Sequence, residues 1–198
     1  MSPLKKKLLM KAFKKAIILP SKKLEEKGLY RADLQSAVRD GLIKRIAPGL
    51  YRLPEAEVTE NHSLVEATER VPYGVVCLLS ALRFHELTTQ SPHEVWMAIP
   101  RAKWIPKVKG LRIVQFATNA MESGIASHSI EGSTVRITTP ARTVADCFKF
   151  RNKIGLDVAI EALRDLRRSR KSSVDEIMSQ AHLCRVANVM RPYMEAVV

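Results

Sequence analysis

The stretch from Pro20 to Leu53 constrains the fold of this chain more than any other segment. Ser21 is a favourable helix cap, and Gly28 tolerates the left-handed conformation that ends many helices, which together predict a short helix over Lys22–Lys27. A second helix is predicted over Arg31–Asp40, where another glycine follows. We therefore expect two helices joined by a tight glycine turn.

A basic hairpin is predicted directly after these helices. Leu42–Ile46 and Leu50–Leu53 have the composition of strands, and the turn Ala47-Pro48-Gly49 separates them. Two helices with a glycine turn, followed by a hairpin, have the order of a winged helix-turn-helix, whose second helix enters the major groove of DNA. We expect this module over residues 1–54.

The charge of the chain is concentrated in the same segment. Residues 1–53 hold 14 Lys and Arg against 4 Asp and Glu, a net of +10, while the whole chain has a net of +13. Clustered cations gain free energy from counterion release on a polyanion. Double-stranded DNA is therefore the expected partner of this segment.

The N-terminal residues supply the remaining helix of the module. Ser2 and Pro3 make a good helix start, and apolar residues recur at helical spacing up to Ile17 among six lysines. A basic amphipathic helix of this kind also suits an anionic membrane surface. We favour the first helix of the winged module, because its apolar stripe gives the short second helix something to pack against.

One face of the second predicted helix carries candidate DNA contacts. Arg31, Gln35 and Arg39 recur every four residues, while Leu34 and Val38 are expected on the core side. Arginine and glutamine suit bidentate contacts with guanine and adenine edges, and hairpin cations suit phosphates. The full set of predicted DNA-binding residues is Tyr30, Arg31, Gln35, Ser36, Arg39, Lys44, Arg45, Tyr51 and Arg52.

Residues 55–198 predict a second domain, so that the chain as a whole is expected to be α+β. Pro54–Glu60 is polar and acidic, as expected of a linker. Strands are predicted over Glu94–Ile99 and Leu111–Phe116, and a hairpin over Ser127–Thr138, which gives an α/β domain with a small mixed sheet. The predicted helices, which include the C-terminal end, are Val75–Glu86, Thr139–Phe150, Leu156–Arg168, a short one capped by Ser173, and Arg185–Ala196.

A second basic cluster without acidic members surrounds Trp104 and consists of Arg101, Lys103, Lys107, Lys109 and Arg112. It predicts either a nucleic-acid surface with the indole as a stacking platform, or a solvated loop whose tryptophan packs into the core. Arg83 and Arg142 are isolated on predicted helices. Arg142 lies in a first turn, where the helix dipole disfavours a cation, so we expect an anionic partner there or a pair with Asp146 one turn on.

Signatures of catalysis and of cofactors are missing from the sequence. It contains no GxSxG, HExxH, Walker A or Rossmann pattern, and its five histidines are scattered. Cys77, Cys147 and Cys184 are far apart, which favours reduced core thiols over disulfides or zinc. No apolar run reaches the ~18 residues of a membrane span, and no signal peptide is evident. We expect a cytoplasmic, non-enzymatic protein without cofactor, metal or membrane association.

Several strings together resemble the AbiEi-type antitoxin family of type IV toxin–antitoxin systems, over nearly the full length of the chain. They are Asp33-Leu34, Ala47–Pro54, Leu79–His85, Val95–Pro100 and Thr139–Phe148. Tyr30 departs from the pattern, because a Ser or Thr is usual at the cap of the recognition helix.

The resemblance implies a bifunctional protein. Its winged domain would bind inverted repeats in its own promoter and repress transcription, and its C-terminal domain would counteract a nucleotidyltransferase-like toxin in abortive phage infection, without needing to bind the toxin directly. The candidate residues for antitoxicity are Arg83, Arg101, Lys103 and Arg142. The alternative is a plain winged-helix regulator whose C-terminal domain senses a ligand or mediates assembly.

Overall fold

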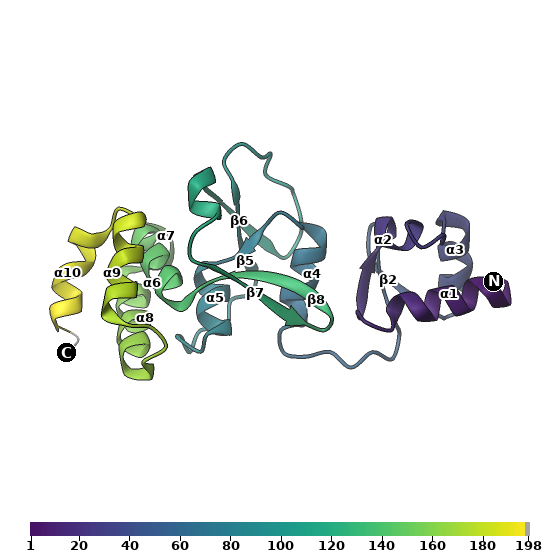
Figure 1. Ribbon diagram of the computed structural model, residues 1–198, viewed down its shortest axis with the longest axis horizontal. Helices are drawn as coiled ribbons and strands as arrows, with labels where there is room; N and C mark the ends of the chain where they lie inside the picture. Colours follow the sequence, from purple (N-terminus) through teal and green to yellow (C-terminus); the bar gives the residue numbers. More distant parts are fainter. Residues whose placement is uncertain (197–198) are drawn as a thin grey trace. The chain divides into compact units, whose positions relative to one another are not determined.

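The computed structural model describes residues 1–196 and has the mixed α+β architecture expected from the sequence (Figure 1). The chain forms two compact units. The first comprises Met1–Pro72 together with Ser129–Val135, and the second comprises Tyr73–His128 and the chain from Arg136 onward. This division differs from the predicted boundary after residue 54, because the linker, the next helix and a distant hairpin tip belong to the first unit.

The first unit contains a winged helix-turn-helix. Its three-stranded antiparallel sheet has the order β1-β3-β2, and β2 and β3 form the wing. In chain order the elements are α1 (Pro3–Phe13), β1 (Ile18–Pro20), α2 (Ser21–Glu25), α3 (Arg31–Arg39), β2 (Lys44–Ala47) and β3 (Leu50–Arg52).

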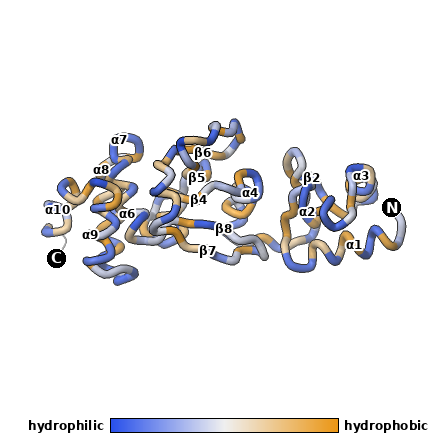
Figure 2. Tube along the Cα trace, turned by 45° about the horizontal axis from the view of Figure 1, so that its top comes forward, coloured by the Kyte–Doolittle hydropathy of each residue, from blue (hydrophilic) through white to orange (hydrophobic). Residues whose placement is uncertain are grey.

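The N-terminal helix α1 packs in the core of this module. Leu9 and Phe13 of α1 are buried together with Leu24 of α2 and Leu34 of α3. Hydrophobic and hydrophilic residues alternate along α1 in Figure 2, as expected of a helix with one buried side. The apolar stripe therefore serves the winged fold, as we favoured over a membrane-surface role.

Two further segments complete the first unit: α4 (His62–Arg70) and the turn between β7 (Ile125–Ile130) and β8 (Ser133–Thr138). The backbone N–H of Ile17 donates to the Glu131 carbonyl at 3.2 Å. The Glu131 carboxylate accepts from the Thr59 N–H at 2.7 Å and lies 2.7 Å from His62 Nδ1. The hairpin tip is thereby tied both to the α1–β1 connection and to the start of α4.

The second unit is built on a five-stranded mixed sheet of order β6-β5-β4-β8-β7. The central pairings combine both directions, because β4 (Val75–Val76) is antiparallel to β5 (Val95–Pro100) and parallel to β8, while β6 (Leu111–Phe116) is parallel to β5. The strand expected over Glu94–Ile99 is thus interior and largely buried, as predicted.

The helices of this unit lie beside the sheet and gather at the C-terminal end of the chain (Figure 1). They are α5 (Leu78–Phe84), a short 3-10 helix (Thr118–Met121), α6 (Pro140–Lys149), α7 (Arg151–Ile154), α8 (Leu156–Ser169), α9 (Val174–Leu183) and α10 (Ala187–Ala196). The predicted capping box at the start of α9 is present, with Ser173 and Glu176 exchanging hydrogen bonds. One helix prediction was wrong at its start, since Val75 and Val76 form a strand rather than the first turn of a helix.

Candidate nucleic-acid interface

Helix α3 presents the three predicted base-reading side chains to solvent. Arg31, Gln35 and Arg39 are all exposed, while Leu34 and Ala37 on the opposite side are buried. Val38 was expected on the core side, but it is 38% exposed. The buried side of α3 is centred between Leu34 and Ala37, and Val38 lies one residue, or about 100°, beyond Ala37 toward the exposed side.

The helix and the wing enclose a hollow of about 440 Å³ that brings five of the predicted residues together. These five are Arg31, Gln35, Arg39, Arg45 and Tyr51. Glu25 of α2 contributes a carboxylate to the same hollow. Tyr51 forms part of the wall but is only 9% exposed, so its ring supports the site rather than reaching a ligand.

The wing carries two cations side by side. Lys44 of β2 lies directly opposite Arg52 of β3 in the antiparallel register. Like charges in this position repel each other and destabilise a sheet. Lys44 is exposed and Arg52 is half-buried, with its Nε buried and unpartnered among the described side chains. The pair is more easily explained by an anion that lies across the wing than by stability.

The start of α3 is fixed by an acidic residue instead of a Ser or Thr cap. The Asp33 carboxylate accepts from the Tyr30 N–H at 3.0 Å and from Lys5 Nζ at 3.1 Å. The hydrogen bond from the Tyr30 backbone, followed by that from Lys5, lowers the pKa of Asp33. Tyr30 itself is exposed, with Lys5 Nζ 5.4 Å from the centroid of its ring.

Ser36 is the weakest of the predicted DNA contacts. Its hydroxyl donates to Asp40 Oδ2 at 3.4 Å, and the residue is half-buried. The same Asp40 oxygen pairs with the N-terminal ammonium group at 2.9 Å, which lowers the pKa of Asp40. Ser36 is therefore directed toward its own helix, one turn on.

In the second unit, the basic loop after β5 is exposed together with its tryptophan. Trp104 is 85% exposed, so the alternative in which it packs into the core is wrong. Arg101 and Lys103 are exposed as well, and the Gln115 side-chain amide donates to both of their carbonyls. Arg83 is exposed at the end of α5, apart from this loop.

Arg142 does not lie on an exposed cationic surface, which corrects the expectation that grouped it with the other three antitoxicity candidates. The residue is 2% exposed. Its Nε donates to Asp146 Oδ2 at 2.9 Å, and its two terminal nitrogens donate to the carbonyls of Ser123 and Ala120 at 2.9 and 3.2 Å. The pair with Asp146, which the sequence offered as the simpler explanation, is thus formed.

Three cations that the sequence did not single out gather beside Arg101. A hollow of about 510 Å³ in the second unit is lined by Arg101, Lys149, Arg151 and Arg185, and Arg142 also belongs to its lining. No carboxylate belongs to this lining within the described chain. These cations lie 48 to 84 residues after Arg101, at separations that no spacing rule connects, so only the fold could show their proximity.

The three thiols behave as expected of core cysteines. Cys77, Cys147 and Cys184 are free and buried. Burial raises the pKa of the Cys184 thiol to about 12, and its Sγ donates to Asp146 Oδ1 at 3.4 Å. Across residues 1–196, no three His, Cys, Asp or Glu side chains gather in a way that could hold a metal ion. Within the same range, no helix has the length and apolar character that crossing a bilayer requires.

The fold places the chain among proteins that join a winged helix-turn-helix to an α+β domain. No family model and no curated protein matches the sequence. The structure is similar to the crystal structure of the RV2827C protein from Mycobacterium tuberculosis, with a TM-score of 0.60 and 14% sequence identity. The match covers 91% of this chain and 72% of that chain, and at this identity it supports the fold alone.

Proposed function

We propose that this protein binds double-stranded DNA through α3 and the wing. The observation that carries the proposal is the single hollow in which Arg31, Gln35 and Arg39 of α3 face Arg45 of the wing. Such a helix supplies base contacts in the major groove, and the wing cations supply phosphate contacts. The like-charged pair of Lys44 and Arg52 supports the same assignment.

The sequence resemblance to AbiEi-type antitoxins extends the proposal. The DNA site would be an inverted repeat in the protein's own promoter, and the second unit would counteract a nucleotidyltransferase-like toxin in the cytoplasm without catalysis of its own. For that second role the best-supported residues are the cations that line the hollow of about 510 Å³, namely the exposed Arg101, Lys149 and Arg185 and the half-buried Arg151. Arg83 and Lys103 are exposed candidates outside this hollow.

A plain DNA-binding regulator remains the second candidate function. The observation in its favour is again the 510 Å³ hollow, since a ligand-sensing domain needs a cavity of this size. Co-expression with a toxin distinguishes an antitoxin from a plain regulator. An antitoxin restores growth, and replacing Arg101 and Lys149 by glutamate reduces that rescue while promoter binding is unchanged. A plain regulator has no effect on toxicity.

DNA binding is tested by mobility shifts of the full chain with duplexes from its upstream region and with scrambled duplexes, across a range of salt. Arg39→Ala is expected to weaken specific binding by about 1–3 kcal/mol and to relax preference at one base position. Lys44→Ala is expected to weaken binding to all duplex sequences alike and to reduce the salt dependence of the binding constant by about one unit of slope. Identical behaviour of the two variants would contradict the division into base and phosphate contacts.

A further inference from the structure

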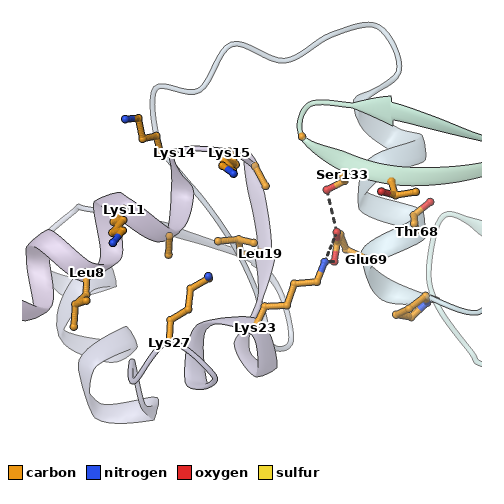
Figure 3. A pocket seen from close by; sticks show the side chains of 15 residues that line it. Leu8, Lys11, Lys14, Lys15, Leu19, Lys23, Lys27, Thr68, Glu69 and Ser133 are labelled. Carbon is orange, nitrogen blue, oxygen red and sulfur yellow. Dashed lines mark hydrogen bonds and ion pairs between the residues drawn. The ribbon is translucent and has the colours of Figure 1, made fainter.

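A second hollow of the first unit lies apart from the DNA-binding face. Its volume is about 770 Å³, within the roughly 300–1,000 Å³ typical of small-molecule sites. Its walls come from α1, β1, the end of α2, α4 and the β7–β8 turn (Figure 3). It shares no residue with the 440 Å³ hollow between α3 and the wing.

The charged side chains that line this hollow are predominantly basic. Its lining contains five exposed lysines, which are Lys11, Lys14, Lys15, Lys23 and Lys27. The one carboxylate in the lining, Glu69, is already engaged. Its two carboxylate oxygens, Oε1 and Oε2, lie 3.0 and 2.9 Å from Lys23 Nζ, and Oε1 also accepts a hydrogen bond from Ser133 Oγ at 2.9 Å. For the other four lysines, no carboxylate partner is found among residues 1–196.

Much of the rest of the lining is aliphatic, and Thr68, Ser133 and Thr134 add hydroxyl groups. Leu8, Ala12 and Ala16 of the N-terminal segment and Leu19 of β1 contribute apolar walls, and no aromatic residue belongs to the lining within the described chain. Figure 3 shows the amine of Lys27 extending into the space beside Leu19, whereas Lys14 points away. An occupant of the hollow would therefore meet apolar walls and lysine amines at the same time.

We propose that this hollow binds an anionic amphiphile, meaning a molecule with an aliphatic body and a phosphate or carboxylate head. Lysine presents a compact point charge on a flexible stem, which suits such heads without demanding the planar geometry that arginine prefers. The aliphatic walls bury the body of the ligand, and a base or other flat aromatic ring finds no stacking partner. The ligand would contact α2, the helix that precedes the recognition helix.

The proposal is tested by isothermal titration of the full chain with dodecyl phosphate and with dodecanoate, both below the concentrations at which they form micelles. The two arms separate a phosphate head from a carboxylate head. At least one is expected to bind, whereas dodecanol, which lacks the charge, and inorganic tripolyphosphate, which lacks the aliphatic body, are expected to bind at least tenfold more weakly.

The variant Lys11→Gln with Lys27→Gln is expected to bind the amphiphile at least tenfold more weakly than the wild type, with an unchanged melting temperature. Lys6→Gln with Lys7→Gln is the matched control, because both lysines are exposed on α1 and lie outside the hollow. Equal binding of dodecanol or of tripolyphosphate would overturn the proposal, as would unchanged affinity of the Lys11/Lys27 variant. Absence of binding by both amphiphiles would overturn it as well. If the Lys11/Lys27 variant then also lowered the salt slope of duplex binding, the lysines would be assigned to the DNA backbone instead.

Discussion

Arg142 and Asp146 of α6 form an ion pair whose side chains are only 2% and 1% exposed. Burial raises the pKa of Asp146, although Arg142 opposes this shift. The carbonyls of Ser123 and Ala120 each accept from one terminal nitrogen of Arg142, and the Cys184 thiol donates to the second Asp146 oxygen. A buried and hydrogen-bonded ion pair is costly to break, because the surviving partner keeps an uncompensated charge.

Arg142→Ala is therefore expected to lower the free energy of unfolding by about 3–5 kcal/mol, measured by urea denaturation. Arg191→Ala, on the exposed surface of α10, is the control and is expected to stay within about 0.5 kcal/mol of the wild type. A small effect of Arg142→Ala on stability, combined with a loss of toxin rescue, would instead show that Arg142 acts on a ligand.

His85 gives a second residue-level prediction. Its Nε2 lies 2.7 Å from the Thr138 carbonyl, and desolvation by burial, more than the nearby His128 and Lys171, lowers its pKa from the usual 6.5. The unfolded chain then takes up the proton first, so the stability that a neutral His85 provides is complete above about pH 6.5 and is lost as the pH falls.

Unfolding experiments between about pH 7 and 5 are expected to show a smaller loss of stability for His85→Gln than for the wild type. Glutamine keeps an N–H donor for the Thr138 carbonyl. His93→Gln, at an exposed histidine, is the control and should follow the wild type. Parallel curves for all three proteins would show that His85 does not contribute to the pH dependence.

At the scale of elements, the turn between β7 and β8 has no room for a side chain at position 132. Gly132 has a φ of +78°, and a Cβ atom there would lie 1.5 Å from the Lys15 carbonyl oxygen. The turn therefore approaches the backbone at the α1–β1 connection more closely than any other residue type would allow. Together with the contacts of Glu131, this approach makes the tip part of the first unit.

Gly132→Ala is expected to destabilise the protein by about 1–3 kcal/mol more than Gly41→Ala. Gly41 has a similar φ of +72° but nothing within 4 Å of an added Cβ, so its substitution carries only the backbone strain. Thermal unfolding of both variants measures the difference. Equal losses would mean that the tip is not held against Lys15 in solution.

The sequence predicted those elements that carry their own local signals. The glycine turn, the cap of α9 and the strands β5 and β6 were all visible in the residues. The short strand β1 was not expected, because three residues give no periodicity and their pairing with β3 involves residues 30 or more positions away. Val75 and Val76 were assigned to a helix, because an apolar run of this length has no period that distinguishes a helix from a strand.

The candidate site was predictable in part for the same reason. Arg31, Gln35 and Arg39 share a face by helical spacing alone, and the structure leaves that face open. The burial of Arg142 depends on carbonyls 19 and 22 residues earlier in the chain. The grouping of Lys149 and Arg185 with Arg101 depends on how α6 and α9 pack, which no local pattern encodes.

At the scale of the whole molecule, most of the positive charge lies in the segment that forms the winged module. The N-terminal segment that forms the winged module holds a net charge of +10 out of +13, and it has the exposed arginine and glutamine face of α3. Charge alone gives attraction to any polyanion, whereas a sequence preference requires base contacts. The central claim is that α3 supplies those contacts.

The most direct test is fluorescence anisotropy of the full chain with its upstream duplex and with a scrambled duplex, comparing Arg31→Ala/Gln35→Ala/Arg39→Ala with Arg164→Ala/Arg191→Ala. Both variants lose two positive charges, but Arg164 and Arg191 are exposed in the second unit. Three contacts worth about 1–3 kcal/mol each predict that the first variant loses at least about 100-fold in specific affinity and binds both duplexes alike. The control variant should keep the wild-type preference. Unchanged affinity of the α3 variant for the upstream duplex would contradict the account.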